Sequence, residues 1–204
     1  MWIDISKAWQ AAFTEGWESF KKGSIPIGAA IADENDDIIC TGRNRVAEIT
    51  NGNHRIAHAE TDCLNKLDTS KYPDLKKYTI YACMEPCPMC MGTIVMSNLV
   101  KIRVAARDGY CGSIHYCEDD RYVKNKNINT FFELGDLQLV QLTIQTYFEL
   151  KMNNGASNEI IDCFAADCPE AVEIARKFYK NRTLDKLAEQ NTDFSIVYNL
   201  IVTS

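Results

Sequence analysis

Two short clusters of potential metal ligands constrain this chain more than any other feature. The first is His58-Ala59-Glu60, and the second is Cys87-Pro88-Met89-Cys90. One imidazole and two thiolates supply three of the four ligands of a tetrahedral zinc, and the open fourth position is typical of catalytic sites, where it holds water. Glu60 lies two residues after the histidine, close enough to exchange protons with that water. We therefore predict a zinc site in which Glu60 is not a ligand.

The two clusters are predicted to lie at the starts of two helices. Cys87 and Cys90 are three residues apart, so they share one face of a helix, and Pro86 is tolerated where that helix begins. Unpaired N–H groups and the helix dipole favour thiolates in a first turn. His58 and Glu60 would not share a face within an ideal helix, but at a helix entry both can point beyond its end. The predicted site is thus two helix N-termini that converge on one ion.

Two other interpretations of the cysteines remain open. Cys83 precedes Cys87 by four residues, and with His58 it could complete a Cys₃His structural zinc site that has no open position. The C-x-x-C pattern also occurs in thioredoxin-like redox proteins. A closed zinc site has no bound water, so Glu60 would have no function there. A redox role of the cysteines would not explain why His58-Ala59-Glu60 is present.

Length and composition fit one domain, or one domain with an appendage. The chain has 204 residues, of which 46% are hydrophobic and 25% charged, as in ordinary globular proteins. It has no run of eighteen apolar residues and no signal-peptide pattern in residues 1–7, so we expect a cytoplasmic protein without membrane contact. Its nine cysteines are an odd number, and most are interpreted as small buried apolar residues in a reducing compartment.

The charge balance favours a small substrate over a nucleic acid. The formal net charge is −6, whereas a protein that grips RNA usually needs a basic face to neutralise phosphates. Lys76-Lys77 and Lys124-Asn125-Lys126 are short basic stretches, which we interpret as solvated loops. The net charge therefore disfavours binding of nucleic acid. Such binding stays an alternative that would require a local basic patch.

Apolar periodicity predicts the elements of the first half. Ile5, Trp9, Phe13, Trp17 and Phe20 recur every three or four positions, so they form one face of a helix that Gly23 can end. The following segments are then expected: strands at 25–33 and 38–43 that pair as a hairpin, a loop at 44–56, a helix at 57–67, a strand at 78–83, a helix from 86 or 87 to 98, and a strand at 100–106.

The second half is predicted with a long loop, a last strand and several helices. Residues 107–130 form the long polar connection, and 137–148 is interpreted as a fifth strand. Helices at 160–164 and 171–179 flank Pro169, Thr183 could cap a third at 184–190, and 194–202 could be strand or helix. This order predicts a three-layer α/β/α sandwich with a central five-stranded mixed sheet in residues 1–150, and a mainly helical extension packed on it in residues 151–204.

The motifs resemble those of the cytidine deaminase-like superfamily. The pattern H-x-E…P-C-x-x-C is the signature of zinc-dependent deaminases. Within the superfamily the chain is most similar to the nucleobase deaminases, guanine deaminase among them, and to the tRNA-adenosine deaminases. The matching stretches, in a resemblance that covers roughly residues 1–150, are Pro26–Ala30, Gly42–Asn44, Ala57–Glu60 and Glu85–Gly92.

This resemblance implies roles for residues at and near the clusters. It implies a zinc held by His58, Cys87 and Cys90, with Glu60 as the proton shuttle. It also implies that the backbone N–H groups of Ala59 and Cys87 lie near the reacting centre, and usually that the protein is a homodimer.

Four further residues are candidate contacts to the substrate. The resemblance implies that Asn44 hydrogen-bonds the edge of the base, although the residue could also be a turn residue after its strand. In related purine deaminases the region that follows the strand at 100–106 helps to close the pocket, which makes Asp108, Tyr110 and His115 candidate contacts. Each of them could equally be an ordinary turn residue.

The predicted function is hydrolytic deamination of a free purine base or nucleoside, with a guanine-like substrate as the first hypothesis. Glu60 takes a proton from the zinc-activated water and returns protons to a ring nitrogen and to the leaving ammonia. No organic cofactor is needed. The alternatives are a tRNA wobble-adenosine deaminase, a cytosine deaminase, and a non-catalytic zinc-stabilised binding protein, for which an intact Glu60 would have no use.

Two parts of the chain do not match a pattern of the superfamily. The loop at 107–130 fits no single specificity pattern, so the sequence does not reveal which base is deaminated. The extension after residue 150 is unmatched, and it could either form an oligomer interface or cover the pocket.

Overall fold

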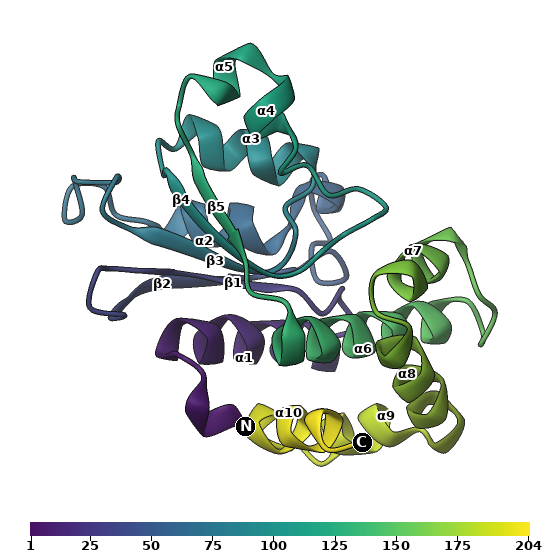
Figure 1. The fold of residues 1–204 in the computed structure, drawn as a ribbon. Helices are drawn as coiled ribbons and strands as arrows, with labels where there is room; N and C mark the ends of the chain where they lie inside the picture. The colour runs from purple at the N-terminus through teal and green to yellow at the C-terminus, as the bar shows by residue number, and fades with distance from the viewer.

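A five-stranded mixed sheet forms the middle layer of the computed structural model, which describes residues 1–204 (Figure 1). The strand order is β2-β1-β3-β4-β5. The strands are β1 (Gly28–Ala32), β2 (Ile38–Arg43), β3 (Thr79–Met84), β4 (Lys101–Ala106) and β5 (Asn129–Phe132). β1 pairs antiparallel with β2 and β3, whereas β3–β4 and β4–β5 are parallel. The predicted five-stranded mixed sheet is therefore confirmed.

Helices cover both faces of the sheet, as the sandwich prediction requires. Helices α2 (Ala59–Lys66) and α3 (Pro88–Met96) lie on one face, and α1 (Lys7–Lys21) and α6 (Gly135–Met152) lie on the other (Figure 1). Alternate residues of a strand point to opposite faces. Accordingly, Ala29 and Ile31 of β1 belong to the core cluster under α2 and α3, while Ala30 belongs to the cluster under α1 and α6.

Helix α1 and the hairpin follow the predicted pattern closely. Ser6 caps α1 by accepting a hydrogen bond from the backbone N–H of Trp9. The predicted apolar face is buried from Trp9 to Phe20, whereas Ile5 lies before the helix and is partly buried. Gly23, just beyond the helix, has a φ of 75°, a left-handed conformation that glycine adopts at little cost. The second strand spans the predicted residues, and the first is shorter than the predicted 25–33.

The elements around the two ligand clusters also lie where they were expected. The predicted helices at 57–67 and 86–98 correspond to α2 and α3, and the strands at 78–83 and 100–106 correspond to β3 and β4. A short 3₁₀ helix, η2 (His54–Ile56), ends the loop that precedes α2.

The strand predicted at 137–148 is wrong, because this segment lies within helix α6. Consecutive residues from 140 to 148 are all buried, since α6 lies between the sheet and a further layer of helices. A helix buried all round lacks the one-sided apolar stripe that identifies a surface helix. The true fifth strand, β5, begins at the end of the predicted loop at 107–130 and extends past it, and α4 (Tyr116–Asp119) and α5 (Arg121–Lys124) lie within that loop.

The C-terminal part of the chain is helical throughout. It consists of α7 (Glu159–Asp167), α8 (Pro169–Asn181), α9 (Thr183–Glu189) and α10 (Phe194–Val202). Pro169 begins α8 and so separates it from α7, as predicted. The expected cap by Thr183 is wrong, because the N-cap of α9 is Arg182 and no side chain caps the helix. The last segment, predicted as strand or helix, is a helix.

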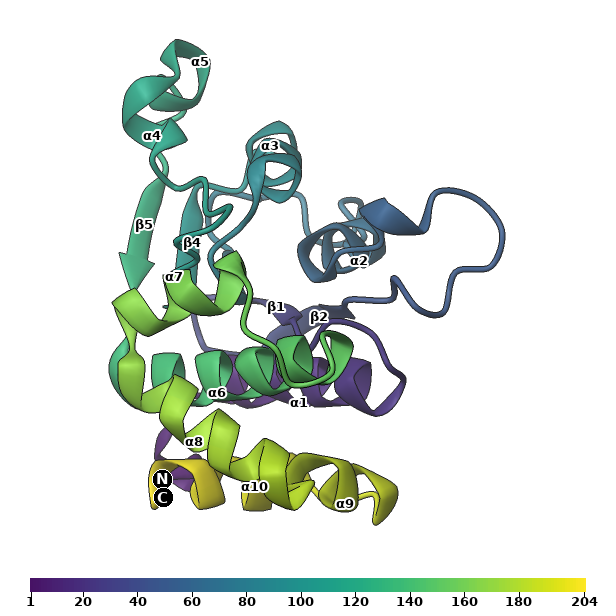
Figure 2. The same ribbon diagram turned by 90° about the vertical axis from the view of Figure 1, so that its right-hand side faces the viewer.

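Helices α8, α9 and α10 form an additional layer below α1 and α6 (Figure 2). One core cluster joins Trp17 of α1 and Tyr147 of α6 to Phe194 and Tyr198 of α10. The extension is thus packed on the sandwich through a shared core. Residue 150 lies in the last turn of α6, so a domain division at this residue stays a prediction. No helix combines the length and the apolar character that crossing a membrane would require.

Candidate active site

The two ligand clusters lie at the starts of two neighbouring helices. His58 is the N-cap residue of α2, Cys87 is the N-cap residue of α3, and Cys90 lies in the first turn of α3. The Nδ1 atom of His58 is 3.6 Å from Sγ of Cys87 and 3.5 Å from Sγ of Cys90. The expected convergence of two helix N-termini is therefore present, and the three donor atoms lie within 4.8 Å of one another.

This arrangement fits a tetrahedral zinc ion. Zn–N and Zn–S bonds of about 2.0 and 2.3 Å at a tetrahedral angle place the nitrogen and sulfur about 3.5 Å apart, which matches the two distances above. Cys83, the fourth residue of a possible Cys₃His site, is fully buried in the cluster under α1 and α6 and is not part of the donor group. The closed structural site is therefore wrong, and the donor group that could hold a metal ion consists of His58, Cys87 and Cys90.

The two thiols of the donor group differ in protonation. Hydrogen bonding with Cys90, assisted by His58, lowers the pKa of Cys87 to about 4, so this ligand is a thiolate at neutral pH. The same contact with Cys87, together with burial, raises the pKa of Cys90. The hydrogen bond to Cys87 raises the pKa of His58. A metal ion that binds the three atoms must replace the protons they share.

Glu60 lies beside the ligands in a desolvated position. Its side chain is only 3% exposed, it lines the same cavity as His58 and Cys87, and burial raises its pKa. A carboxyl group whose pKa lies above its usual range can both accept and donate a proton near neutral pH, as a general acid–base catalyst must.

The start of α2 has no side-chain cap and lies at the cavity. Neither α2 nor α3 has a side-chain hydrogen bond at its N-cap, so N–H groups of their first turns are available to a ligand. Ala59 is the first residue of α2, is fully buried and lines the cavity. Gly42 allows the close approach of α2 to β2, because a Cβ atom at this position would lie 2.4 Å from the carbonyl oxygen of Ala59.

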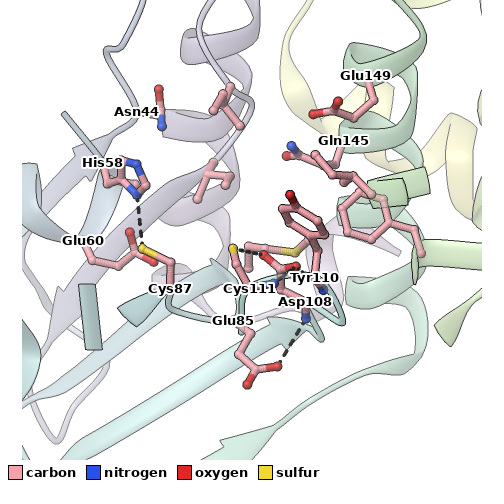
Figure 3. Close-up of a pocket in the computed structure, with 16 residues that line it drawn as sticks. Asn44, His58, Glu60, Glu85, Cys87, Asp108, Tyr110, Cys111, Gln145 and Glu149 are labelled. Carbon is pink, nitrogen blue, oxygen red and sulfur yellow. Dashed lines mark hydrogen bonds between the residues drawn. The ribbon is translucent and has the colours of Figure 1, made fainter. Parts of the chain in front are cut away.

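Asn44 is a turn residue that also lines the cavity. Its Oδ1 atom accepts a hydrogen bond of 3.1 Å from the backbone N–H of Val46, as a turn residue would. Its backbone is held at both ends, by the carbonyl oxygen of Ile27 at 3.0 Å and the hydroxyl of Ser19 at 2.8 Å. The residue is 1% exposed and lines the cavity (Figure 3), so the turn holds an amide against the space above the ligands.

The loop after β4 brings Asp108 and Tyr110 to the cavity. The Asp108 side chain accepts hydrogen bonds from the backbone N–H groups of Tyr110 at 3.0 Å and Cys111 at 3.1 Å, so it shapes this loop as well as lining the cavity. Tyr110 is 52% exposed, and the Cys111 side chain, which the sequence did not single out, is a further part of this wall.

Glu85 fixes the same loop from the other side. Its carboxylate accepts hydrogen bonds from the backbone N–H groups of Asp108 at 3.2 Å and Ile114 at 3.1 Å. Gly112 packs directly against this side chain, since a Cβ atom there would lie 2.4 Å from Cδ of Glu85. The side chain of His115, in contrast, is exposed, packs edge-on against Tyr116 at 4.8 Å and does not line the cavity.

Four wall residues come from helices α6 and α7, far from the two clusters in the sequence. Gln145 and Glu149 of α6 lie across the cavity from His58 and Glu60 (Figure 3). Residues four apart share a helix face, so this pair could have been found only if the segment had been assigned as a helix. The remaining two, from α7, are Ile160 and Phe164. Part of the extension thus covers the pocket.

The cavity is small and its charged groups are all acidic. Its volume is about 180 Å³. Among the sixteen residues that line it there is no lysine or arginine, whereas four carry carboxylates: Glu60, Glu85, Asp108 and Glu149.

Comparison with known proteins identifies the family. Residues 3–106 match the family described as the cytidine and deoxycytidylate deaminase zinc-binding region. The chain belongs to this family. This deaminase is 34% identical over 112 residues to a tRNA-specific adenosine deaminase of Rickettsia bellii, which covers 53% of the chain and 72% of the relative. It is 27% identical over 113 residues to a cytosine deaminase of Candida albicans, and this match covers 55% of the chain and 73% of the relative.

Solved structures share the fold of the deaminase. A structure from work on A-to-I editing by tRNA A34 deaminases aligns with a TM-score of 0.51 and 19% identity, over 63% of this chain and 96% of that chain. A structure of guanine deaminase from Nitrosomonas europaea aligns with a TM-score of 0.50 and 17% identity, over 71% of this chain and 85% of that chain. The family and the donor group together make the protein a zinc-binding enzyme that hydrolyses a C–N bond.

The family match covers only one side of the pocket. It includes the zinc ligands and Glu60 but ends at residue 106. The wall that Asp108, Tyr110 and helices α6 and α7 contribute lies outside it. The chemistry of the deaminase is therefore shared with the family, whereas this wall must be understood from the structure of this chain.

Proposed function

We propose that this deaminase acts on a free purine base or nucleoside, with a guanine-like base as the first candidate. The observation that carries the proposal is the acidic, covered wall of the cavity, which lacks lysine and arginine. Zinc is held by His58, Cys87 and Cys90, and the substrate enters the space between these ligands and helices α6 and α7.

The charge of the wall disfavours a phosphorylated substrate. Binding of nucleic acids relies on lysine and arginine side chains that neutralise phosphates, and a nucleotide needs similar contacts to its phosphate. Four carboxylates line the cavity instead, in a protein of net charge −6. A neutral base or nucleoside meets no such repulsion.

The size and hydrogen-bonding character of the cavity support a single base. A volume of about 180 Å³ is below the roughly 300–1,000 Å³ of pockets that enclose drug-sized ligands. Carboxylates act only as hydrogen-bond acceptors when ionised. The carboxylates of Glu85 and Asp108 already accept backbone N–H groups of the loop. Glu60 and Glu149 remain as acceptors for the N–H donors that a guanine-like base presents around its rings.

The residues around the ligands have the properties that hydrolytic deamination needs. When bound, zinc lowers the pKa of a water molecule so that it can act as a nucleophile at neutral pH. Glu60 accepts a proton from the water and delivers protons to a ring nitrogen and to the departing ammonia. Asn44 and the N–H group of Ala59 hold the base with its amine-bearing carbon toward Glu60. No organic cofactor takes part.

A tRNA wobble adenosine is the second candidate substrate, and similarity to a tRNA-specific adenosine deaminase supports it. Cytosine is the third, supported by similarity to a cytosine deaminase. A non-catalytic zinc-stabilised protein would have no use for the buried carboxyl of Glu60. The homodimer that the resemblance implies is part of this proposal, and light scattering on the purified chain tests it.

The experiment is an assay of ammonia release by the zinc-loaded protein. The substrates are guanine, adenine, cytosine, their nucleosides and a tRNA anticodon stem-loop, and the Glu60→Gln variant serves as the blank. Turnover of a purine base or nucleoside is the expected result. Activity on the stem-loop alone, or on cytosine alone, would overturn the proposal in favour of the corresponding alternative.

A further inference from the structure

Gln145 is a buried polar residue whose amide oxygen pairs with no group of the protein. Its side chain is 6% exposed, and its amide oxygen Oε1 has no hydrogen-bond partner. Four other residues have a buried side-chain nitrogen or oxygen atom without a partner, but Gln145 is the one that lines the cavity. Leaving a buried acceptor unsatisfied costs stability, so an unpaired amide at this place suggests a ligand that pairs with it.

A second glutamine on the same helix shows what a structural role would look like. Gln141 lies one turn earlier on α6 and is 1% exposed. Its Nε2 atom donates a hydrogen bond of 3.1 Å to the backbone carbonyl oxygen of Pro26. This amide fastens α6 to the segment before β1. Gln145 has the same residue type and similar burial but forms no such link through its oxygen.

The position of Gln145 determines which part of a substrate it can contact. It lies across the cavity from the zinc ligand His58 and from Glu60 (Figure 3). The carbon that loses its amine must face Glu60, so the opposite edge of the base faces Gln145. In a purine whose six-membered ring is held at the metal end, the five-membered ring points toward α6.

Contacts between α6 and α7 form the wall around Gln145. Glu149, one turn further along α6, accepts a hydrogen bond of 2.9 Å from the Nδ2 atom of Asn158. Ile160 and Phe164 of α7 complete this side of the cavity. A ligand group that reaches α6 therefore meets Gln145 beside the hydrogen-bonded Glu149 and the apolar side chains of α7.

We propose that Gln145 is a specificity-determining residue that selects the free purine base over its nucleoside. Its amide pairs with the N–H group of the five-membered ring, and a carboxamide can accept one hydrogen bond from a base edge and donate another. In a nucleoside the sugar replaces this hydrogen and occupies the space in front of α6. The inference rests on the proposed function and narrows its substrate class from base or nucleoside to base.

The test separates loss of the hydrogen bond from the bulk of a sugar. Guanine and 9-methylguanine differ by one small group, and the methyl compound has no N–H in its five-membered ring. Their dissociation constants are measured by calorimetry with zinc-loaded Glu60→Gln protein, which should bind without turnover. The measurement is repeated after adding Gln145→Leu, and again after adding Gln141→Leu as the matched control.

With Gln145 present, guanine is expected to bind about tenfold more tightly than 9-methylguanine, the discrimination typical of one good base-edge pair. Gln145→Leu should abolish this difference without lowering the unfolding temperature, because it removes an unpaired polar group. Gln141→Leu should lower the unfolding temperature and leave the difference intact.

Two results would overturn the inference, and they can be told apart from failure of the proposed function. A Gln145→Leu protein that still prefers guanine tenfold, or one that loses stability as Gln141→Leu does, would show that Gln145 is structural. If the wild-type protein releases ammonia from no purine base or nucleoside, the proposed function itself fails, and this inference fails with it.

Discussion

The carboxylate of Glu149 accepts a hydrogen bond of 2.9 Å from the side-chain amide of Asn158. The oxygen of the same amide caps helix α7 by accepting the N–H of Ile161 at 2.9 Å. One side chain thus holds both a pocket carboxylate on α6 and the start of the helix that covers the pocket. Helix α7, which covers the pocket, is therefore linked through Asn158 to the wall residue Glu149 of α6.

Removing this amide should loosen the cover. Asn158→Ala deletes a helix cap, which typically costs about 1 kcal/mol of unfolding free energy, and frees Glu149. We expect a lower stability in chemical denaturation and a higher KM for the substrate. The control is Asn158→Asp, which keeps the capping oxygen but cannot donate to Glu149. If Asn158→Asp has the wild-type KM, the contact with Glu149 has no part in binding.

The zinc site should depend on Cys87 and not on Cys83. Cys87→Ala removes one of three converging ligands, so the purified protein is expected to contain little zinc. Cys83 is fully buried on the opposite face of the sheet, and Cys83→Ala should keep one zinc per chain. Metal analysis of both variants checks this, and loss of zinc from Cys83→Ala would restore the closed Cys₃His site.

Glu60 should be needed for turnover but not for the metal. Glu60→Gln preserves size and removes proton exchange, so the rate is expected to fall by about a hundredfold to ten-thousandfold, the usual contribution of general acid–base catalysis. Its zinc content should equal that of the wild type. A variant that lost its zinc would instead identify Glu60 as a ligand.

The loop that contains Asp108 should not tolerate a side chain at Gly112. A Cβ atom there would lie 2.4 Å from Cδ of Glu85 and 2.6 Å from the carbonyl oxygen of Asp108, so Gly112→Ala must displace the loop. We expect kcat/KM to fall while the zinc content is unchanged.

A matched glycine on α3 provides the control for this substitution. No atom lies within 4 Å of a Cβ atom built at Gly92, and a helical Gly→Ala change typically adds about 0.5–1 kcal/mol of stability. Gly92→Ala should thus be active and slightly more stable. Equal activity of the two variants would mean that the loop does not shape the site.

The contact between α9 and α6 should make stability depend on pH. Burial, the largest single influence, raises the pKa of Asp185. The hydrogen bond of 2.8 Å from Lys151 and the charge of Lys151, together with Tyr147 and Arg182, outweigh it, so the pKa lies below its usual value. A carboxyl whose folded-state pKa is lowered stabilises the protein above its unfolded-state pKa of about 3.9, and this contribution is lost as the pH falls through the folded-state value.

The Asp185→Asn variant tests this dependence. It should be less stable than the wild type at pH 7, and the difference should shrink as the pH falls below about 4, where the wild-type carboxyl becomes protonated. Urea denaturation from pH 3 to pH 7 measures it. A constant difference over this range would contradict an electrostatic origin.

Much of the fold could be predicted because its patterns are local. The apolar face of α1 shows the helical period, and β2 ends at the residues predicted for it. The exceptions lie where burial hides the period. Helix α6 is apolar on several faces because it is covered from both sides, and β5 is a short edge strand in which Phe131 is 52% exposed.

The residue types and spacing of His58, Glu60, Cys87 and Cys90 determined the chemistry of the site. Zinc ligation depends on which nitrogen and sulfur atoms the side chains supply. The types and order of these residues along the chain reveal those atoms. The face of the sheet on which a side chain lies does not follow from its distance to the motif along the sequence. Cys83 lies next to the motif in the sequence, yet the alternation of its strand turns it to the opposite face.

The wall of the pocket was decided by the tertiary structure alone. The motifs precede three of its residues, Gln145, Glu149 and Phe164, by more than fifty positions. These residues reach the cavity because α6 packs against the sheet and α7 folds back over α6. His115 lies close in sequence to Asp108, yet its side chain is exposed. Which groups face a substrate depends on how distant segments pack, and no local pattern carries that information.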